Sequence, residues 1–250
     1  MRGIKPLIFF HIIVNLGMKK CLVLLFVILS SIWVDAQRLS ENFNPKILWF
    51  AQVDQAMSTP AGKIIVISDA SFANGVSSTR IARFNADGSL DPTFDVGFGP
   101  RNYDPTVLPS IASAIASSDN KLLVCGNFQG FNGRTSHGIA RLNIDGSVDT
   151  SFSSWVPQDS PVTAVAYQST GKIIVCYGTP EISKLMRLNS DGTPDNSFEI
   201  ISINGYVSTL AVLPDDMLLA GGSFSDFGGP AEPHNLVQSG ANGPFDNTFN

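Results

Sequence analysis

Residues 120–152, NKLLVCGNFQGFNGRTSHGIARLNIDGSVDTSF, decide the fold of this chain. The segment opens on a short, continuously apolar run, LLVC, which is typical of a β-strand covered on both faces. A loop rich in Gly and Asn leads to a second apolar run, IARLN, and then to the pair Asp145-Gly146. Asp-Gly between two strand-like runs is a strong signal for a tight β-hairpin. The segment therefore predicts a set of short antiparallel strands.

The same pattern occurs four times along the chain. The other copies begin with GKIIVISDASF at Gly62, GKIIVCYGTPE at Gly171 and DMLLAGGSFSDF at Asp216. The four closing phenylalanines, spaced by 58, 46 and 51 residues, are Phe94, Phe152, Phe198 and Phe249. A period of this length is typical of repeat proteins in which each unit buries its apolar faces against its neighbours.

Each copy predicts four strands. The first is an apolar segment, at 47–53, 111–117, 162–168 or 207–213. A turn joins it to the second, which is KIIVI, KLLVC, KIIVC or MLLAG. The third is RIARFN, GIARLN or LMRLN in the first three copies, and a type I′ turn at Asp-Gly joins it to the fourth. The fourth strand is expected to end in Asp-x-[Ser/Thr]-Phe.

Four short antiparallel strands per repeat predict an all-β fold, a β-propeller of four-stranded blades. The blades are expected at about 47–94, 110–152, 162–198 and 207–249. Because one blade cannot bury both of its faces alone, radial stacking covers the faces and leaves only short edges. A β-solenoid is the alternative, although its repeats are usually shorter.

Residues 39–43, LSENF, resemble the end of a fourth strand and precede the first complete copy. Phe43 and Phe94 are 51 residues apart, in step with the other spacings. The N-terminal strand of a closed propeller commonly completes the last blade, yet the last copy here already has its own fourth strand. We therefore expect an incomplete propeller with four repeats present, and closure as four blades is the alternative.

The repeat GKIIV…NG…IARLN-x-DGS-x-D-x-SF resembles the delta-60 repeat, a β-propeller-like repeat of large exported bacterial proteins. The resemblance covers about residues 39–250. It implies a secreted or cell-surface protein and no common activity. The third copy departs from the pattern because it lacks the F-x-x-F-N-G loop. The fourth reads NLVQSGANG in place of IARLN-x-DG, so its third strand is expected to be the least well specified.

Residues 1–36 differ from the repeats and predict a signal peptide. Lys19 and Lys20 precede an apolar run at 21–32, and Val34-Asp-Ala36 offers a small-residue cleavage site before Gln37. Met18 is a candidate for the true start. An uncleaved membrane anchor is the alternative, because residues 4–16 are apolar as well. The net charge of −5 without a basic cluster disfavours a nucleic-acid partner.

The repeated turn N-x-D-G-x-x-D is the sharpest candidate for a metal site. Its members are Asn85, Asp87 and Asp91, then Asn143, Asp145 and Asp149, then Asn189, Asp191 and Asp195. The spacing matches positions 3, 5, 6 and 9 of calcium-binding loops, where several oxygens converge on one ion. Position 1, however, holds a cation, Arg83, Arg141 or Arg187. The favoured alternative is a hairpin turn whose second Asp pairs with this Arg or with backbone N–H groups, and no cofactor is then expected.

The loops after the second strands are the second candidate site. They contain aromatic and amide side chains that could contact a sugar ring, namely Asn74, Phe128, Phe131, Asn132, Phe224 and Phe227. Loops on one face of a propeller commonly bind ligands. The alternative, which we favour, is that the phenylalanines pack between blades and that Asn-Gly makes a turn.

Enzyme motifs are absent from the sequence, which holds no G-x-S-x-G, no P-loop and no H-E-x-x-H. We therefore expect an exported, non-enzymatic scaffold or binding module that presents loops to a protein or glycan at the cell surface. One alternative is a secreted polysaccharide-active hydrolase or lyase, marked by clustered carboxylates with raised pKa values at the channel mouth. The other is a structural spacer of a large surface protein.

Overall fold

The structure is a computed structural model that describes residues 52–68, 72–73, 76–77, 80–227 and 234–243. The predicted leader, the orphan strand at 39–43 and the closing strand at Phe249 lie outside the described residues. The described part consists of strands, turns and loops. It contains no helix with the length and hydropathy that a membrane span requires.

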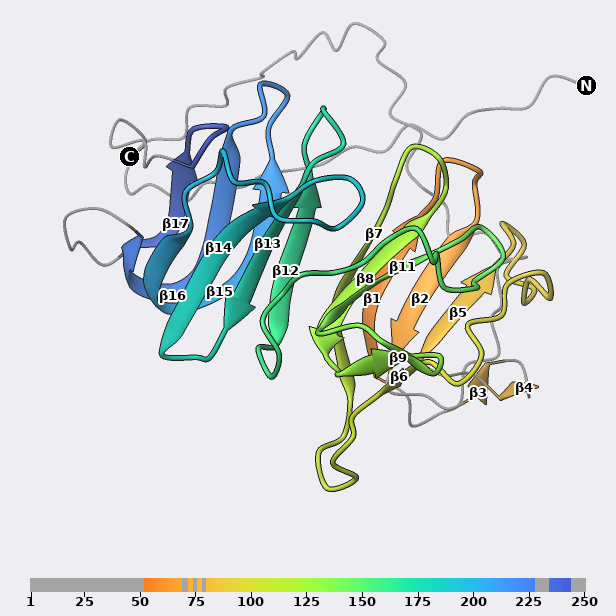
Figure 1. Cartoon of the computed structure of the whole chain (residues 1–250). Helices are drawn as coiled ribbons and strands as arrows, with labels where there is room; N and C mark the ends of the chain where they lie inside the picture. The colour runs from red at the N-terminus through yellow and green to blue at the C-terminus, as the bar shows by residue number, and fades with distance from the viewer. Residues whose placement is uncertain (1–51, 69–71, 74–75, 78–79, 228–233, 244–250) are drawn as a thin grey trace, which may run out of the picture. The chain divides into compact units, whose positions relative to one another are not determined.

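The first two blades are separate antiparallel sheets (Figure 1). One orders β1 (Val53–Ser58), β2 (Ile64–Ser68) and β5 (Ile81–Phe84), and the other orders β7 (Ser110–Ala116), β8 (Leu122–Asn127) and β11 (Ile139–Leu142). The sequence placed the first strand of the first blade at 47–53, but β1 begins at Val53. The tight turn that closes between Thr59 and Lys63 places the strand directly before it.

The third and fourth blades share one six-stranded sheet. Its strands, in order, are β12 (Val162–Tyr167), β13 (Ile173–Gly178), β14 (Ile182–Leu188), β15 (Ile201–Val212), β16 (Leu218–Phe227) and β17 (His234–Ser239). The first half of the long strand β15 pairs with β14, where Leu185 is opposite Ile201. Its second half begins the fourth blade, where Val212 is opposite Leu218. The blades are therefore joined by a strand that belongs to both.

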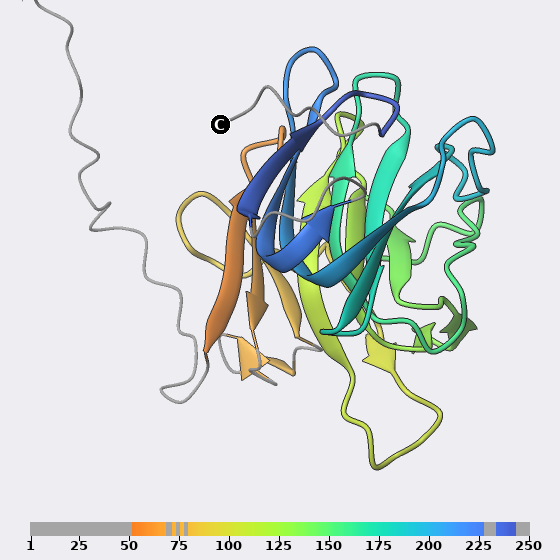
Figure 2. The same ribbon diagram turned by 90° about the vertical axis from the view of Figure 1, so that its left-hand side faces the viewer.

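Small two-residue strands extend the first two blades. They are β3 (Phe72–Ala73) with β4 (Val76–Ser77), and β6 (Pro100–Arg101) with β9 (Gly130–Phe131) and β10 (Arg134–Thr135). The innermost strands of successive blades touch, since β1 contacts β7, β7 contacts β12 and β12 contacts β15. Figure 2 shows the sheets one behind another. No strand of the first blade pairs with a strand of the fourth among the described residues, so the fold is a β-propeller with open ends.

The apolar second strands form the core because both of their faces are covered. Leu122 and Val124 of β8 lie in a cluster with Ile65 and Ile67 of the first blade. Leu123 and Cys125, which alternate with them, lie in a cluster with Val175 of the third blade. Side chains that alternate along a strand point to opposite faces. The uninterrupted run LLVC therefore exists because blades lie on both sides of it.

The predicted fourth strand is much shorter than expected. It is reduced to single bridges, Phe84–Leu90, Leu142–Val148 and Leu188–Pro194. The hairpin turn is also different from the predicted type I′. Gly88 has a φ of 83°, but Asp87 is not among the residues with positive φ, and Gly88 N–H donates to the Asn85 carbonyl. This is a three-residue hairpin loop with glycine in the left-handed position. The chain leaves the sheet after the bridge because a second turn follows, in which Phe94 N–H donates to the Asp91 carbonyl at 3.3 Å.

The glycine of this turn packs against the preceding blade. Gly146 has a φ of 88°, and a Cβ there would lie 2.6 Å from the carbonyl oxygen of Asp95. Asp95 N–H donates to the Asp145 carbonyl at 2.8 Å. The turn of the third blade repeats the contact, with Ser153 N–H donating to the Asp191 carbonyl at 2.9 Å. Each of these turns therefore accepts a backbone hydrogen bond from the segment that leaves the preceding blade.

We expect Gly146→Ala to destabilise the protein more than Gly171→Ala. Gly171 has a similar φ of 78°, but no atom lies within 4 Å of the position of its Cβ. Both substitutions cost about 1–2 kcal/mol because the backbone is left-handed. Only the first also displaces the neighbouring blade. Thermal unfolding of the two variants tests this, and equal losses would contradict the packing of the turn between blades.

Candidate functional site

The first Asp of each repeated turn closes the turn itself. Asp145 Oδ1 accepts hydrogen bonds from the Ser147 N–H at 2.9 Å and the Ser147 hydroxyl at 2.7 Å. Asn143 Nδ2 donates to the same hydroxyl at 3.0 Å. Asp87 with Ser89 and Asp191 with Thr193 repeat this geometry. The hydrogen bond from the Ser147 hydroxyl lowers the pKa of Asp145.

The second Asp of each turn is paired with two cations. Asp149 Oδ2 lies 2.8 Å from Arg141 Nε and 2.8 Å from Lys121 Nζ. Its Oδ1 accepts the N–H and the hydroxyl of Ser151. The equivalent ion pairs are Asp91 with Arg83 and Lys63, and Asp195 with Arg187 and Lys172. The pairing of Asp with Arg that the sequence favoured is therefore confirmed.

The guanidinium also reaches the next blade. Arg141 Nη1 donates to the Ser190 carbonyl, and Arg83 Nη1 donates to the Ile144 carbonyl. Arg187 Nη1 donates to the Ala241 carbonyl at 3.0 Å and to Asn242 Oδ1 at 3.0 Å. Each guanidinium lies over the closing phenylalanine of its own repeat, for example 4.7 Å from the ring centre of Phe152. We call this set of Arg, Lys, Asp and Phe the Arg–Asp latch.

The carboxylate oxygens of the turn already have partners within the chain. The two carboxylates of a turn do not converge, because one caps Ser147 and the other faces a guanidinium and an ammonium. A calcium ion would compete with both cations for the same oxygens. In the described ranges no group of three or more His, Cys, Asp or Glu side chains could hold a metal ion.

The candidate loop phenylalanines pack inside the protein. Phe128 and Phe131 are buried, and their rings meet edge to face at 5.7 Å. Phe224 is buried as well, in the cluster shared by the third and fourth blades. Rings in these positions cannot stack on a sugar, so the packing alternative holds for them. Asn132 accepts the Phe98 N–H at 3.3 Å and belongs to a turn with positive φ.

The side chains of two members of the candidate loops, Phe227 and Asn74, lie outside the described residues. Phe227 ends β16, where it is opposite Ile203, and its side chain lies outside the described residues. Asn74 lies outside them entirely.

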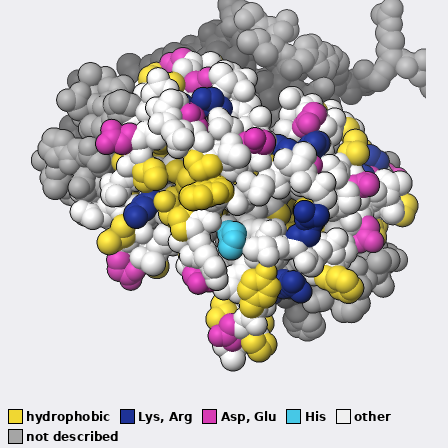
Figure 3. Space-filling view, viewed as in Figure 1, with side chains coloured by type: hydrophobic (Ala, Val, Ile, Leu, Met, Phe, Trp, Pro, Cys, Tyr) yellow, Lys and Arg dark blue, Asp and Glu magenta, His cyan; other side chains and the backbone are white. Residues whose placement is uncertain are grey.

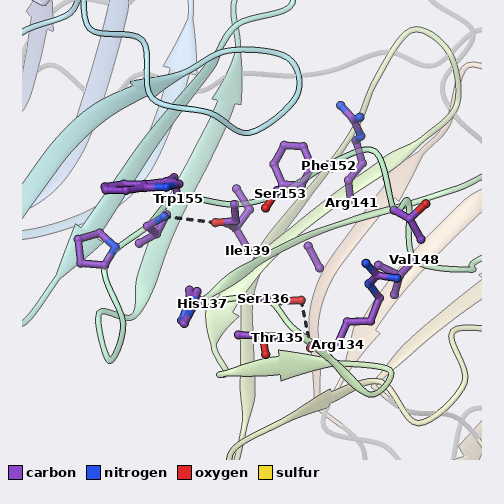
Figure 4. A pocket seen from close by; sticks show the side chains of 15 residues that line it. Arg134, Thr135, Ser136, His137, Ile139, Arg141, Val148, Phe152, Ser153 and Trp155 are labelled. Carbon is purple, nitrogen blue, oxygen red and sulfur yellow. Dashed lines mark hydrogen bonds between the residues drawn. The ribbon is translucent and has the colours of Figure 1, made fainter.

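A cleft that the sequence did not predict opens beside the second blade (Figure 4). It has a volume of about 500 Å³ and lies between β10–β11 and the connection to the third blade at 150–157. Arg134, Ser136, His137, Phe152 and Trp155 are among its lining residues. The exposed Trp155 in a connection of small polar residues was the signal in the sequence that could have indicated it.

His137 separates this cleft from a smaller one. It lines both the first cleft and a second of about 280 Å³, which also contains Asn102, Gln129 and Asp159. The Nδ1 atom of His137 is buried without a hydrogen-bond partner. A third cleft of about 430 Å³ contains Tyr167, whose hydroxyl is buried and unpartnered and whose pKa burial raises to about 12.

Comparison with known proteins supports the fold. A family model described as a β-propeller domain of unknown function (DUF5122) matches residues 60–94, 117–152 and 168–198. These ranges are the first three repeats, so the chain is built of β-propeller repeats. No curated protein matches the sequence.

Three solved structures are similar at low identity. A protein of B. thetaiotaomicron, described as the extracellular domain of a one component system, has a TM-score of 0.43 and 7% identity over 75% of this chain and 21% of its own. A prolyl endopeptidase has a TM-score of 0.41 and 16% identity over 78% and 26%. A protein of Bacteroides ovatus ATCC 8483, described as a hydrolase, has a TM-score of 0.36 and 13% identity over 76% and 69%. The chain therefore spans about a quarter or less of the first two proteins, and such identities transfer no function.

We expect the Arg–Asp latch to make the protein sensitive to acid. The hydrogen bond from Lys172, with those from Ser197 and Arg187, outweighs burial and holds the pKa of Asp195 well below its ordinary value. A lowered pKa stabilises the fold above the unfolded-state pKa of about 3.9, and this stability is lost as the pH falls further.

Asp195→Asn should therefore lower the free energy of unfolding at pH 7 by about 2–3 kcal/mol. The melting temperature of the variant should also fall less steeply than that of the native chain between about pH 5 and pH 3. Glu199→Gln, which removes an exposed charge four residues away, is the control and should leave the acid dependence unchanged. Parallel melting curves of native chain and Asp195→Asn over this range would contradict the latch as the source of stability.

Proposed function

We propose that this chain is an exported, non-enzymatic scaffold or binding module of the delta-60 type that presents the connections between its blades to a protein or glycan at the cell surface. The observation that supports this most directly is where the exposed apolar side chains lie. Among the described residues, six of the ten large hydrophobic side chains that are exposed lie on the connections between blades.

The exposed set is concentrated on three connections. Phe98, Tyr103, Val107 and Leu108 lie between the first and second blades, Trp155 between the second and third, and Ile200 between the third and fourth. Phe98 is 87% exposed and Trp155 is 65% exposed. Large apolar groups gathered outside a core commonly mark a binding surface. Figure 3 shows hydrophobic side chains clustered on the face that also bears the histidine.

The carboxylates support a binding role over acid catalysis. A glycosidase needs a carboxylic acid whose pKa is raised, so that it remains protonated near neutral pH. Among the described residues, each Asp or Glu with a displaced pKa has it lowered, and hydrogen bonds from neighbouring hydroxyl and N–H groups contribute in every case. Such groups are poor proton donors at neutral pH.

The proposal that the protein is exported rests on the predicted signal peptide at residues 1–36, and it can be tested separately. The full chain, expressed in a bacterial host with a C-terminal tag, should be recovered outside the cytoplasm with Gln37 as its first residue. Mass spectrometry of the N-terminal peptide measures this. A protein that keeps Met1 or Met18 and stays in the cytosol would contradict the proposal.

Binding through the connections can be tested by one combined variant. The full chain is incubated with separated envelope proteins and with purified envelope polysaccharides, and bound chain is quantified. Replacing Phe98, Leu108, Trp155 and Ile200 by Ser should reduce binding about tenfold or more, because a few large side chains supply most of the affinity of an interface. The melting temperature should change little because all four are exposed.

The matched control replaces exposed apolar residues that lie within blades. Val53, Ile144, Ile182 and Leu236 are exposed to a similar degree. Their replacement by Ser should leave binding intact. Equal loss in both variants would point to general stickiness and overturn the role of the connections.

A further inference from the structure

We propose that the cleft between β11 and residues 150–157 binds an anionic glycan, in which a sugar ring stacks on Trp155 and a uronic carboxylate pairs with Arg134. The inference rests on the proposed function and specifies one ligand class and one site for it. It is argued from the charge of the cleft, its two anchoring side chains and the reason that it is open.

The charge of the cleft is opposite to that of the chain. The sequence carries a net charge of −5. The residues that line the cleft nevertheless include Arg134, Arg141 and His137 and no Asp or Glu. Figure 3 shows the histidine of this face flanked by hydrophobic side chains on one side and by Lys or Arg side chains on the other. An anionic ligand can therefore approach without meeting a carboxylate of the lining.

The two arginines of the lining differ in whether their guanidinium groups can pair with a ligand. Arg141 belongs to the Arg–Asp latch and is held by Asp149 at 2.8 Å. Arg134 is exposed on β10, and none of the hydrogen bonds or ion pairs found in the described residues involves its side chain. A guanidinium can bind a carboxylate through two parallel hydrogen bonds. Arg134 is therefore the residue of this cleft that is free to hold an anion.

Trp155 supplies the second anchor. The connection that carries it is fixed on both sides of the residue, because Ser153 N–H donates to the Asp191 carbonyl at 2.9 Å and Val156 is buried. The indole is 65% exposed and thus keeps a free face. Figure 4 shows Trp155 and Arg134 on opposite sides of the cleft with His137 and Ser136 between them. An apolar ring opposite a cation suits a sugar with one apolar face and one carboxylate.

The remaining lining is suited to hydroxyl groups. Five side chains of the lining carry a hydroxyl, namely Thr135, Ser136, Thr150, Ser153 and Ser154. This density of small hydroxyl side chains favours a glycan over an acidic peptide.

The cleft exists because the second blade lacks a strand that the third blade has. In the third blade, β14 pairs along Ile182–Leu185 with the first part of β15. The equivalent residues of the second blade, counted back from Arg141 and Arg187, form a turn at His137 and Gly138 with φ of 30° and 76°. β11 is then the edge of its sheet, and no strand fills the space beside it. β5 of the first blade is an edge strand as well, so the added pairing with β15 is particular to the third blade.

The test uses the full chain and tetramers of galacturonic, glucuronic and mannuronic acid. Binding is measured by titration calorimetry and by the change in tryptophan fluorescence. We expect at least one tetramer to bind and its fully methyl-esterified form to bind about tenfold more weakly or worse. Arg134→Gln and Trp155→Ala should each lose about tenfold in affinity, whereas Trp155→Phe should retain most of it.

Matched controls lie outside the cleft. Leu236→Ala removes an exposed apolar side chain within a blade and Lys184→Gln removes an exposed cation, and neither should change the affinity. Melting temperatures of all variants should stay close to that of the native chain. Unchanged affinity in Arg134→Gln and Trp155→Ala, or equal affinity for the esterified tetramer, would overturn the site.

Two further outcomes separate this inference from the proposed function. Binding of a pentaglutamate peptide in preference to every tetramer would overturn the glycan class. Absence of tetramer binding, combined with loss of envelope binding in the variant of the connections, would refute this site and leave the proposed function standing. Unchanged envelope binding in that variant would refute the proposed function itself.

Discussion

The interaction on which the rest of the structure depends is the Arg–Asp latch. One guanidinium pairs with the Asp of its own turn, lies over the closing phenylalanine and donates to a carbonyl of the next blade, as Arg141 does with Asp149, Phe152 and Ser190. A planar group with five donors can do this, and an ammonium cannot. The latch thus fixes the turn within a blade and the position of the next blade together, which makes stability a nearest-neighbour property of the repeat.

The fourth repeat lacks the arginine and the lysine of the Arg–Asp latch. Counted back from Gly243, Gln238 takes the place of the arginine. Met217 directly precedes the second strand, as Lys172 does, and takes the place of the lysine. Gln238 Nε2 donates to the Met217 sulfur at 3.2 Å, which is a contact between two uncharged side chains. The fourth blade still receives Arg187 of the third at its Ala241 carbonyl. Its own third strand, expected to be the least well specified, is present as β17.

The repeat, the strands and the blade architecture could be predicted from the sequence because they follow from local patterns. The length of the fourth strand could not, since a second turn at Asp91–Phe94 takes the chain out of the sheet after one bridge. The contact of Arg83 with Ile144 joins residues of two repeats, and a pattern within one repeat does not contain it. The cleft was missed for a related reason, because it depends on how residues 136–139 differ from residues 182–185 in backbone conformation.

The structural features that the sequence did not predict bear on where a binding site should be sought. Within the regular repeat the Asn and Asp side chains already have partners, as Asp145 has Ser147 and Asp149 has Arg141. The resemblance of this turn to a calcium loop therefore comes from a hydrogen-bonding pattern that shapes a hairpin. Large exposed aromatic groups lie where the repeat is interrupted, as Phe98 and Trp155 do. A ligand gains most from exposed groups that the fold has left without partners, so the irregular connections are better candidates for recognition than the motif that defines the repeat.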